Sequence, residues 1–172
     1  MIRRERSVPA TLDLFADDTL PAPCIEHIGP RSFVLRGFAL SRGEHLLPAL
    51  ERVLSEAPFR HMVTPGGFTM SAALSNCGSL GWVTDRSGYR YTPIDPGSGN
   101  PWPGLPDVFM QLAQAAASKT GFAGFVPDVC LINRYAPGAK MSLHQDKNEL
   151  DYEWPVVSVS LGIPAMFLFG GM

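Results

Sequence analysis

Hydrophobic residues recur at helical spacing in two stretches of the chain. The first stretch ends before Pro58. Its apolar positions are Leu46, Leu47, Leu50, Val53 and Leu54. This spacing predicts an amphipathic helix, and Ser41 with Glu44 fits a capping box at its start. Pro48 predicts a kink or a late start, because proline has no N–H to donate to the preceding turn.

The second stretch covers residues 107–121 and reads DVFMQLAQAAASKTG. Its apolar face consists of Phe109, Leu112, Ala113 and Ala116. Gly121 follows where the helix should end, because glycine adopts at low cost the left-handed conformation that closes many helices. The pattern therefore predicts a second helix over these residues.

Short apolar runs broken by glycine lie between the two helices and before the first. Residues 33–38 predict one strand, and residues 68–94 predict several, because their apolar and polar positions alternate. Residues 95–106 are dense in proline and glycine and predict a surface loop.

The part of the chain after the second helix also has the pattern of strands and turns. Residues 128–136 predict a strand, Pro137 with Gly138 a turn, and residues 139–146 a further strand. Residues 155–169 predict two more. Two helices with several short strands indicate an α+β protein whose second half is a jelly roll or a similar barrel.

Composition narrows the class of protein. With 172 residues, 45% hydrophobic and 17% charged, the chain has the balance of a soluble globular domain. A net charge of -2 argues against a general binder of polyanions, so any contact with nucleic acid has to be local. No run approaches the roughly 18 apolar residues of a membrane span, so we expect no membrane partner.

Cysteine usage and the first residues bear on the compartment. Cys24, Cys77 and Cys130 are far apart and form no C-x-x-C pair, so we interpret them as free, buried thiols in a reducing cytoplasm. The first residues lack the apolar run of a secretory signal. We therefore expect a cytoplasmic monomer, with residues 1–30 as a polar, proline-rich arm and residues 31–172 as one domain.

His144 and Asp146 form an H-x-D pair. Side chains two residues apart on a strand point to the same face, so the imidazole and the carboxylate would converge. Imidazole plus carboxylate with open positions suits Fe(II), as in the facial triad of two His and one carboxylate. Such a pair also arises by chance, which leaves a role without metal open. Lys140 and Lys147 flank it and offer phosphate contacts, although a solvated charge explains either one.

Asn133 and Tyr135 lie two residues apart on the preceding predicted strand and share a face. An amide and a phenol suit an anionic or carbonyl-bearing cosubstrate, because both form hydrogen bonds with such groups. The alternatives are a strand-edge amide and a core aromatic residue with its hydroxyl at the surface.

Aromatic and basic residues alternate in WVTDRSGYRY. Trp82, Tyr89 and Tyr91 can stack on bases, while Arg86 and Arg90 can meet phosphates, a pattern suited to single strands or flipped nucleotides. A β-hairpin with an exposed basic turn explains the same residues equally well.

Several longer blocks resemble one family. They are MVTPGGFTMSAALSNCGSLGW, YTPIDP, NPWP, NRYAPGAKMSLHQDKNE and VSVSLGIPAMFLFGG. From about Leu12 to the last residue, the chain resembles the bacterial AlkB alkylation-repair dioxygenases. The resemblance implies a double-stranded β-helix (jelly-roll) core, incomplete at the C-terminus, with two flanking helices. It also implies a nucleotide-recognition lid at residues 62–94 and a partial jelly-roll core at residues 126–172.

The resemblance implies a reaction as well. Members of the family use Fe(II), 2-oxoglutarate and O2 to hydroxylate the methyl group of a damaged base such as 1-methyladenine or 3-methylcytosine. The adduct then loses formaldehyde, and 2-oxoglutarate becomes succinate and CO2. The expected partner is single-stranded or locally opened alkylated DNA, with RNA as a second candidate.

The resemblance assigns roles to the residues of the H-x-D stretch and the strand before it. His144 and Asp146 resemble the iron ligands of the family, so they are the expected catalytic and metal residues. Asn133 and Tyr135 resemble the contacts to 2-oxoglutarate.

Five further side chains resemble substrate contacts. Trp82 resembles the aromatic residue that stacks on the flipped base. Tyr89, Lys140 and Gln145 resemble contacts to the nucleic-acid backbone or within the lid. Asn148 departs from the family, whose members carry an aspartate near the exocyclic amine of the base. An amide accepts a hydrogen bond without a charge, so a preference for cationic bases stays open.

Two residues of the family pattern have no counterpart after Asp146. These are the second His ligand and an Arg that pairs with the far carboxylate of 2-oxoglutarate. The histidines here are His27, His45, His61 and His144. We therefore expect a longer chain to supply both residues, and weak iron binding by these residues alone. A non-catalytic binder of single-stranded or damaged nucleic acid is the alternative, and an oxygenase acting on another kind of substrate is a third possibility.

Overall fold

Helices and antiparallel strands make up the computed structural model, which describes residues 23–146 and 151–170. The elements are β1 (Cys24–Gly29), β2 (Ser32–Arg36), η1 (Leu40–Arg42), α1 (Gly43–Glu56), β3 (Ala73–Gly78), β4 (Gly81–Asp85), β5 (Gly88–Thr92), α2 (Asp107–Lys119) and β6 (Val129–Arg134). Within the described ranges the strands form three two-stranded sheets, β1 with β2, β3 with β6, and β4 with β5. All three pairings are antiparallel.

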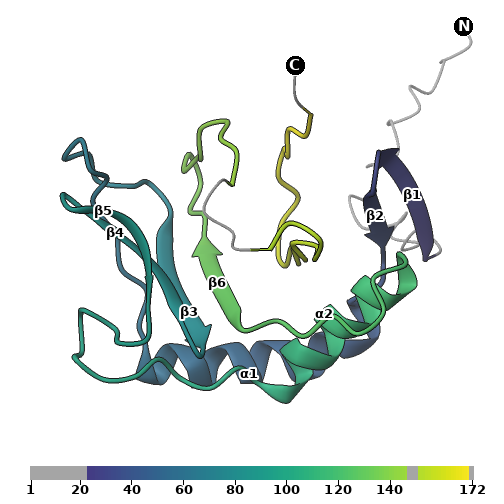
Figure 1. Cartoon of the computed structure of the whole chain (residues 1–172), viewed down its shortest axis with the longest axis horizontal. Coiled ribbons are helices and arrows are strands. Elements are labelled where there is room, and N and C mark those ends of the chain that lie inside the picture. The colour runs from purple at the N-terminus through teal and green to yellow at the C-terminus, as the bar shows by residue number, and fades with distance from the viewer. Residues whose placement is uncertain (1–22, 147–150, 171–172) are drawn as a thin grey trace, which may run out of the picture.

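The two helices lie along one side of the molecule and the strands rise from them (Figure 1). The β3–β6 pair and the β4–β5 hairpin stand at one end, and the β1–β2 hairpin stands at the other. β4 contacts both β3 and β6, and α1 contacts β3. The β3–β6 pair, the β4–β5 hairpin and α1 therefore pack as one unit.

The first helix forms, but its predicted start is wrong. α1 buries Leu46, Ala49 and Val53, as the helical spacing predicts, and it continues through Pro48. Ser41 lies inside the short 3-10 helix η1 instead of at a cap position, and α1 begins at Gly43 without a side-chain cap. The predicted capping box is therefore absent, because Ser41 already has helical neighbours on both sides.

The second helix agrees with its prediction more closely. α2 buries Leu112, Ala116 and Ala117 and ends at Lys119. Gly121 follows with φ of 94°, in the left-handed region. Thr120 and Gly121 donate their backbone N–H groups to carbonyls of the last turn, which closes the helix as expected.

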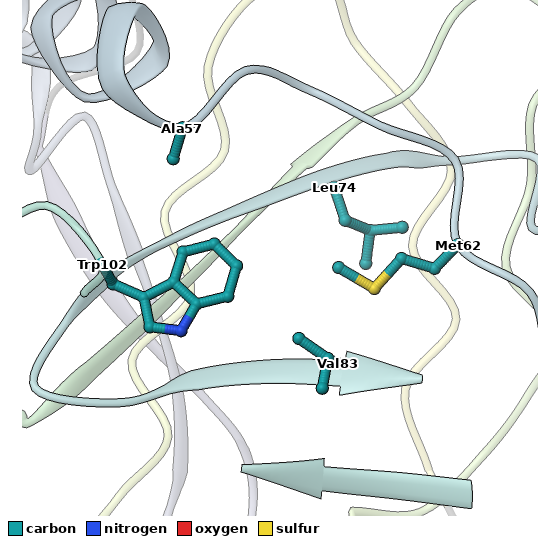
Figure 2. Packing of buried hydrophobic residues seen from close by; sticks show 5 residues of the cluster. All are labelled: Ala57, Met62, Leu74, Val83 and Trp102. Atoms are coloured by element: carbon teal, nitrogen blue, oxygen red, sulfur yellow. The ribbon is translucent and has the colours of Figure 1, made fainter. Parts of the chain in front are cut away.

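A small hydrophobic core joins α1 to the strands. Figure 2 shows Leu74 of β3, Val83 of β4 and Met62 pointing toward one another, with Trp102 and Ala57 beside them. The indole Nε1 of Trp102 donates to the carbonyl oxygen of Thr92 at 2.9 Å, so its polar atom is satisfied. This core fixes the ends of β3 and β4 relative to the loop that contains Trp102.

Glycine is required where β4 begins. A Cβ atom on Gly81 would overlap the indole ring of Trp102, so only glycine allows the loop and the strand to approach this closely. The two-residue connection before Gly81 therefore brings β4 directly onto the core.

The predicted strands at residues 139–146 and 155–169 are wrong for the described part of the chain. No strand is present there, and most side chains are exposed, among them Leu143, Val156, Ile163, Met166 and Phe167. A strand needs a neighbour for its backbone hydrogen bonds and for one apolar face, and no described strand pairs with these residues. The described residues thus contain antiparallel strands and two helices, but no closed jelly roll.

The last described segment packs against the β1–β2 hairpin and the stretch after α2. The guanidinium of Arg31 donates to the carbonyl oxygen of Glu153 at 3.0 Å. The rings of Phe125 and Trp154 lie 6.1 Å apart. This segment therefore crosses between β6 and the β1–β2 hairpin (Figure 1).

The N-terminal region differs from its prediction. β1 lies within the stretch assigned to a polar arm, and Glu26 in β1 forms an ion pair with Arg36 in β2. Cys24 is exposed, so its predicted burial is wrong, whereas Cys77 is buried as predicted. Among the described residues, no helix is both long enough and apolar enough to cross a membrane.

Candidate active site

The β4–β5 hairpin holds Trp82 and Tyr89 together. Trp82 pairs with Tyr91 and Thr84 pairs with Tyr89, so Trp82 and Tyr89 are diagonal neighbours on one face of the hairpin. Their rings are stacked, with centroids 5.6 Å apart and an angle of 25° between the planes. Trp82 packs against the core and Tyr89 is 50% exposed. The pair offers an aromatic surface that is supported from below and open to solvent.

The charges of this hairpin are partly neutralised. Arg90 donates to the carboxylate of Asp85 at 2.6 Å. The hydrogen bonds from Arg90 and from the backbone N–H of Ser87 lower the pKa of Asp85 to about 2. Arg86 is exposed in the turn. Of the two arginines predicted to meet phosphates, Arg90 is therefore committed to an internal ion pair.

Asn133 and Tyr135 lie at the end of β6 and just beyond it. Asn133 faces Leu74 across the β3–β6 pair, and its Oδ1 atom is buried with no hydrogen-bond partner within the described residues. The Tyr135 hydroxyl lies 3.8 Å from the sulfur of Met141, and burial raises the pKa of this phenol. An unpaired buried acceptor is rare in folded proteins, so Asn133 Oδ1 is open to a partner outside the described residues.

A turn at Pro137 and Gly138 reverses the chain after β6, as predicted. Ala139 donates its N–H to the carbonyl oxygen of Ala136 at 2.9 Å, and Gly138 has φ of 84°. Proline and glycine at these two positions favour such a turn. The returning segment is therefore placed beside the end of β6, although it forms no strand.

Ser71 ties the returning segment to the loop before β3. The Ser71 hydroxyl donates to the carbonyl oxygen of Lys140 at 2.6 Å and accepts from the N–H of Lys140 at 3.1 Å. These two bonds join residues 69 positions apart. They fix the backbone of Lys140, and its side chain is exposed.

His144 and Asp146 lie close together on this segment. The His144 Nε2 atom and an Asp146 carboxylate oxygen are 3.6 Å apart, and the two side chains are 55% and 60% exposed. His144 Nδ1 lies 2.8 Å from the carbonyl oxygen of Ser142. Because a carbonyl oxygen only accepts, Nδ1 is the ring nitrogen that donates to Ser142, and Nε2 is the ring nitrogen that lies toward Asp146.

The remaining predicted contacts are less constrained. Gln145 is exposed between His144 and Asp146. Asn148 lies outside the described residues. The structure therefore brings Trp82 together with Tyr89 on the hairpin, and His144 together with Asp146 on the returning segment.

Two supporting interactions were missed by the sequence analysis. The side chain of Asn76 forms two hydrogen bonds with the backbone of Trp82. Arg60 donates to the buried carboxylate of Asp95 at 2.6 Å. Burial alone would raise the pKa of Asp95, but hydrogen bonds from Arg60 and from Gly97 and Ser98 lower it. Each partner lies far along the chain or beyond a turn, so spacing alone gives no signal for them.

Comparison with known proteins decides the family. A model described as the 2OG-Fe(II) oxygenase superfamily matches residues 33–172. The chain belongs to this superfamily. Within it, the chain is 55% identical to the alpha-ketoglutarate-dependent dioxygenase AlkB of Escherichia coli strain K12, over 94% of this chain and 73% of that protein. The AlkB protein of Salmonella typhimurium is 56% identical over the same shares.

The name of a more distant relative mentions the kind of substrate on which that relative acts. The protein named nucleic acid dioxygenase ALKBH1 of Mus musculus is 33% identical over 54% of this chain and 24% of its own length. Together these matches make the chain an AlkB-family dioxygenase, an enzyme class that uses Fe(II), 2-oxoglutarate and O2.

The donors at the H-x-D pair fit an iron ion in part. Two atoms bound at neighbouring positions of one metal ion lie about 3 Å apart when each bond is about 2.1 Å, and Nε2 and the carboxylate oxygen are 3.6 Å apart. A small rotation of two exposed side chains closes that difference. In the described ranges, no three His, Cys, Asp or Glu side chains gather at one point. The described part of this AlkB-family chain thus offers two candidate ligands, His144 and Asp146.

Proposed function

We propose that this AlkB-family protein removes methyl groups from damaged bases in nucleic acid by oxidative dealkylation. The observation that carries the proposal is the stacked Trp82–Tyr89 pair, supported by the core and open to solvent. Base stacking on aromatic side chains tolerates any sequence, which suits an enzyme that recognises damage.

His144 and Asp146 are the proposed iron ligands. The hydrogen bond from His144 Nδ1 to the carbonyl oxygen of Ser142 leaves Nε2, which lies 3.6 Å from Asp146, as the ring nitrogen that would bind the metal. Bound there with 2-oxoglutarate, Fe(II) would supply the oxidation chemistry, in which one oxygen atom of O2 goes to succinate as 2-oxoglutarate loses CO2, the other hydroxylates the methyl group, and the hydroxymethyl group then leaves as formaldehyde.

Asn133 and Tyr135 are the proposed contacts to 2-oxoglutarate. The amide of Asn133 is buried and unpaired at Oδ1, and rotation of the amide plane presents Nδ2 donors at the same place. The protonated phenol of Tyr135 donates to a carboxylate, and its raised pKa keeps the proton at neutral pH. Both groups therefore suit an anionic cosubstrate.

Trp82 is the proposed stacking partner of the flipped base, and Tyr89, Lys140 and Gln145 are proposed contacts to the nucleic-acid backbone or the lid. An enzyme that acts on a base has to extrude the base from the duplex or use a single strand. Stacking of the base on an aromatic side chain offsets part of the free energy that unstacking costs. Asn148 is the proposed neighbour of the exocyclic amine.

The proposed substrates are 1-methyladenine and 3-methylcytosine in single-stranded or locally opened DNA. RNA is a second substrate to test, since the distant mouse relative is named for nucleic acid in general. We also propose that the protein acts in the cytoplasm as a monomer, and that its core is the family's jelly roll. The free thiols Cys77 and Cys130, facing each other in the β3–β6 pair, suit a reducing compartment.

The test is turnover, by the full-length protein, of an oligonucleotide that carries one 1-methyladenine. We expect formaldehyde and succinate in equal amounts, dependent on both Fe(II) and 2-oxoglutarate, and none with the unmethylated oligonucleotide. His144→Ala should abolish both products. His45→Ala is the matched control, because His45 is an exposed histidine on α1, and it should leave product formation unchanged.

A second candidate is non-catalytic binding of damaged or single-stranded nucleic acid. It is favoured by the exposure of His144 and Asp146 and by the two ligand positions that the described residues supply. This candidate predicts oligonucleotide binding that weakens steeply with salt and is the same with or without Fe(II). Product formation in the turnover assay would reject it.

A further inference from the structure

Asn76 occupies an unusual place between two sheets. It lies in β3, and its side chain is fully buried, at 0% exposure. Its Nδ2 donates to the carbonyl oxygen of Trp82 at 3.0 Å, and its Oδ1 accepts from the N–H of Trp82 at 3.0 Å. One side-chain amide thus satisfies both backbone polar groups of one residue.

The two hydrogen bonds replace those of a neighbouring strand. β4 pairs with β5 on one side, and no strand pairs with β4 on the other side within the described residues. Trp82 turns its N–H and carbonyl oxygen toward that unpaired side, where Asn76 meets them. The side-chain amide of Asn76 therefore gives Trp82 the two backbone hydrogen bonds that a neighbouring strand would otherwise provide.

The same side chain links the aromatic pair to the sheet that carries Asn133. Asn76 pairs with Leu131 and Leu74 pairs with Asn133 in the β3–β6 register. Residues opposite each other, and those two apart, share a face, so Asn76 and Asn133 are diagonal neighbours on one face of this pair. Asn76 is thus anchored beside Asn133 and holds Trp82 through its backbone.

We propose that Asn76 is a positioning residue that fixes Trp82 for stacking on the target base. The proposal rests on the proposed function, because it assigns Trp82 to the base. With both backbone groups held, the direction of the Trp82 side chain is set relative to Asn133 and to Tyr89. Without Asn76, the N–H and the carbonyl oxygen of Trp82 lose their partners, and β4 can shift toward other arrangements.

The sharpest variant is Asn76→Asp, because it changes one atom. An ionised carboxylate accepts from the N–H of Trp82 but faces its carbonyl oxygen with a second acceptor. A protonated carboxyl group donates to that oxygen and restores both bonds. Burial raises the pKa of such a group, so the restored form gains population as the pH falls from 8 to about 6. Asn76→Ala removes both bonds at every pH.

The matched control is Ser75→Ala. Ser75 is the neighbour of Asn76 in β3 and is equally buried, but its hydroxyl donates to the carbonyl oxygen of Ala57 at 2.5 Å, away from Trp82. Both alanine variants lose buried hydrogen bonds of β3. Only Asn76→Ala changes the environment of Trp82.

Two measurements test the proposal. Amide hydrogen exchange at Trp82 should accelerate in Asn76→Ala and stay as in the parent protein in Ser75→Ala. Binding of a labelled oligonucleotide with one 1-methyladenine should weaken about tenfold in Asn76→Ala, since part of the stacking contribution is lost. Asn76→Asp should recover most of this affinity at pH 6 relative to pH 8, and the parent protein measured at both values corrects for changes in the ligand.

The outcomes separate this proposal from the proposed function. Equal exchange at Trp82 in both alanine variants overturns the role of Asn76, whatever the ligand does. Faster exchange with unchanged affinity in Asn76→Ala also overturns it, provided that Trp82→Ala weakens binding. If the parent protein shows no preference for the methylated oligonucleotide, the proposed function fails, and the positioning role fails with it.

Discussion

Two parts of this molecule differ in how they hold their proposed site residues. Between residues 57 and 134, Trp82 and Asn133 rest on paired strands, a hydrophobic core and buried hydrogen bonds. Between residues 135 and 146, His144 and Asp146 lie on an exposed segment without a strand, tied back through Ser71 and Lys140. The first part is built by contacts between residues that are far apart in sequence, whereas the contacts of His144 with Ser142 and Asp146 in the second part are local.

The difference teaches that the proposed base-stacking residues and the proposed metal ligands are supported in different ways. Trp82 and Asn133 have little freedom, because each sits in a strand whose neighbours fix its backbone. The two proposed metal ligands have more freedom, because each is more than half exposed. Changes in the first part should therefore alter the free energy of unfolding together with function, whereas changes in the second should alter function alone.

The largest loss of stability is expected from Arg60→Met. Arg60 donates to the buried Asp95 carboxylate and lies over the ring of Trp102, 5.7 Å from its centroid. Methionine keeps an apolar stem but leaves Asp95 buried without its cation, which should cost about 3 kcal/mol. The measurement is the free energy of unfolding in urea.

Arg134→Met is the control for this prediction. Arg134 lies over Phe59, 4.7 Å from the ring centroid, and is exposed. Its replacement should cost less than about 1 kcal/mol, since an exposed cation–π contact is weak. Equal losses in the two variants would show that Asp95 gains nothing from Arg60.

A somewhat smaller loss is expected from Gly81→Ala. The added methyl group would overlap the Trp102 indole, so the loop or β4 has to shift at a cost of about 2 kcal/mol. Gly104→Ala is the control, because nothing lies near a Cβ atom at that position. Thermal unfolding of both variants distinguishes overlap from a general cost of replacing glycine. A Gly81→Ala protein as stable as Gly104→Ala would contradict the close packing.

The sequence predicts the first part of the molecule better than the second, for physical reasons. Helical spacing gives both helices, and the Pro137-Gly138 turn follows from two residues with strong local preferences. The strands at 139–146 and 155–169 were predicted from the local pattern of strands and turns, and such a pattern records a tendency that only a neighbouring strand can satisfy. Both segments have the residue pattern of a strand, but no strand among the described residues pairs with either of them.

The sequence predicts which residues are candidates for the site, but it does not predict the hydrogen bonds that position them. The spacing of His144 and Asp146, and of Asn133 and Tyr135, is visible in sequence because each pair is local. Asn76 and its contact with Trp82 are not visible, because the contact depends on how β4 leaves the core. Local chemistry can be read from residue spacing, whereas the hydrogen bonds that position it depend on tertiary structure.

A smaller effect is expected from the Asp85–Arg90 pair of the hairpin. The pKa of Asp85 is lowered to about 2, so its contribution to stability is present above its ordinary pKa near 4 and is lost as the pH falls toward 2. The melting temperature of Asp85→Asn should lie slightly below that of the parent protein at pH 6, and the two should converge by pH 2. The pair is exposed, so the difference should be no more than a few degrees.

A constant difference across this pH range would mean that the carboxylate is not what Asp85 contributes. The hydrogen bond from Ser87 N–H would not explain such a difference, because the asparagine oxygen of the variant can accept it as well.

The smallest effect on stability, and the largest on function, is expected from His144→Ala and Asp146→Asn. Both side chains are exposed, and their contact at 3.6 Å belongs to the segment without a strand. Each change should alter the free energy of unfolding by no more than about 0.5 kcal/mol, as for most surface substitutions. Each should also remove Fe(II) binding measured by anaerobic calorimetry, since two donors cannot be reduced to one without losing the chelate. A large loss of stability in either variant would mean that the segment is as firmly held as the strands, and the contrast between the two parts would not hold.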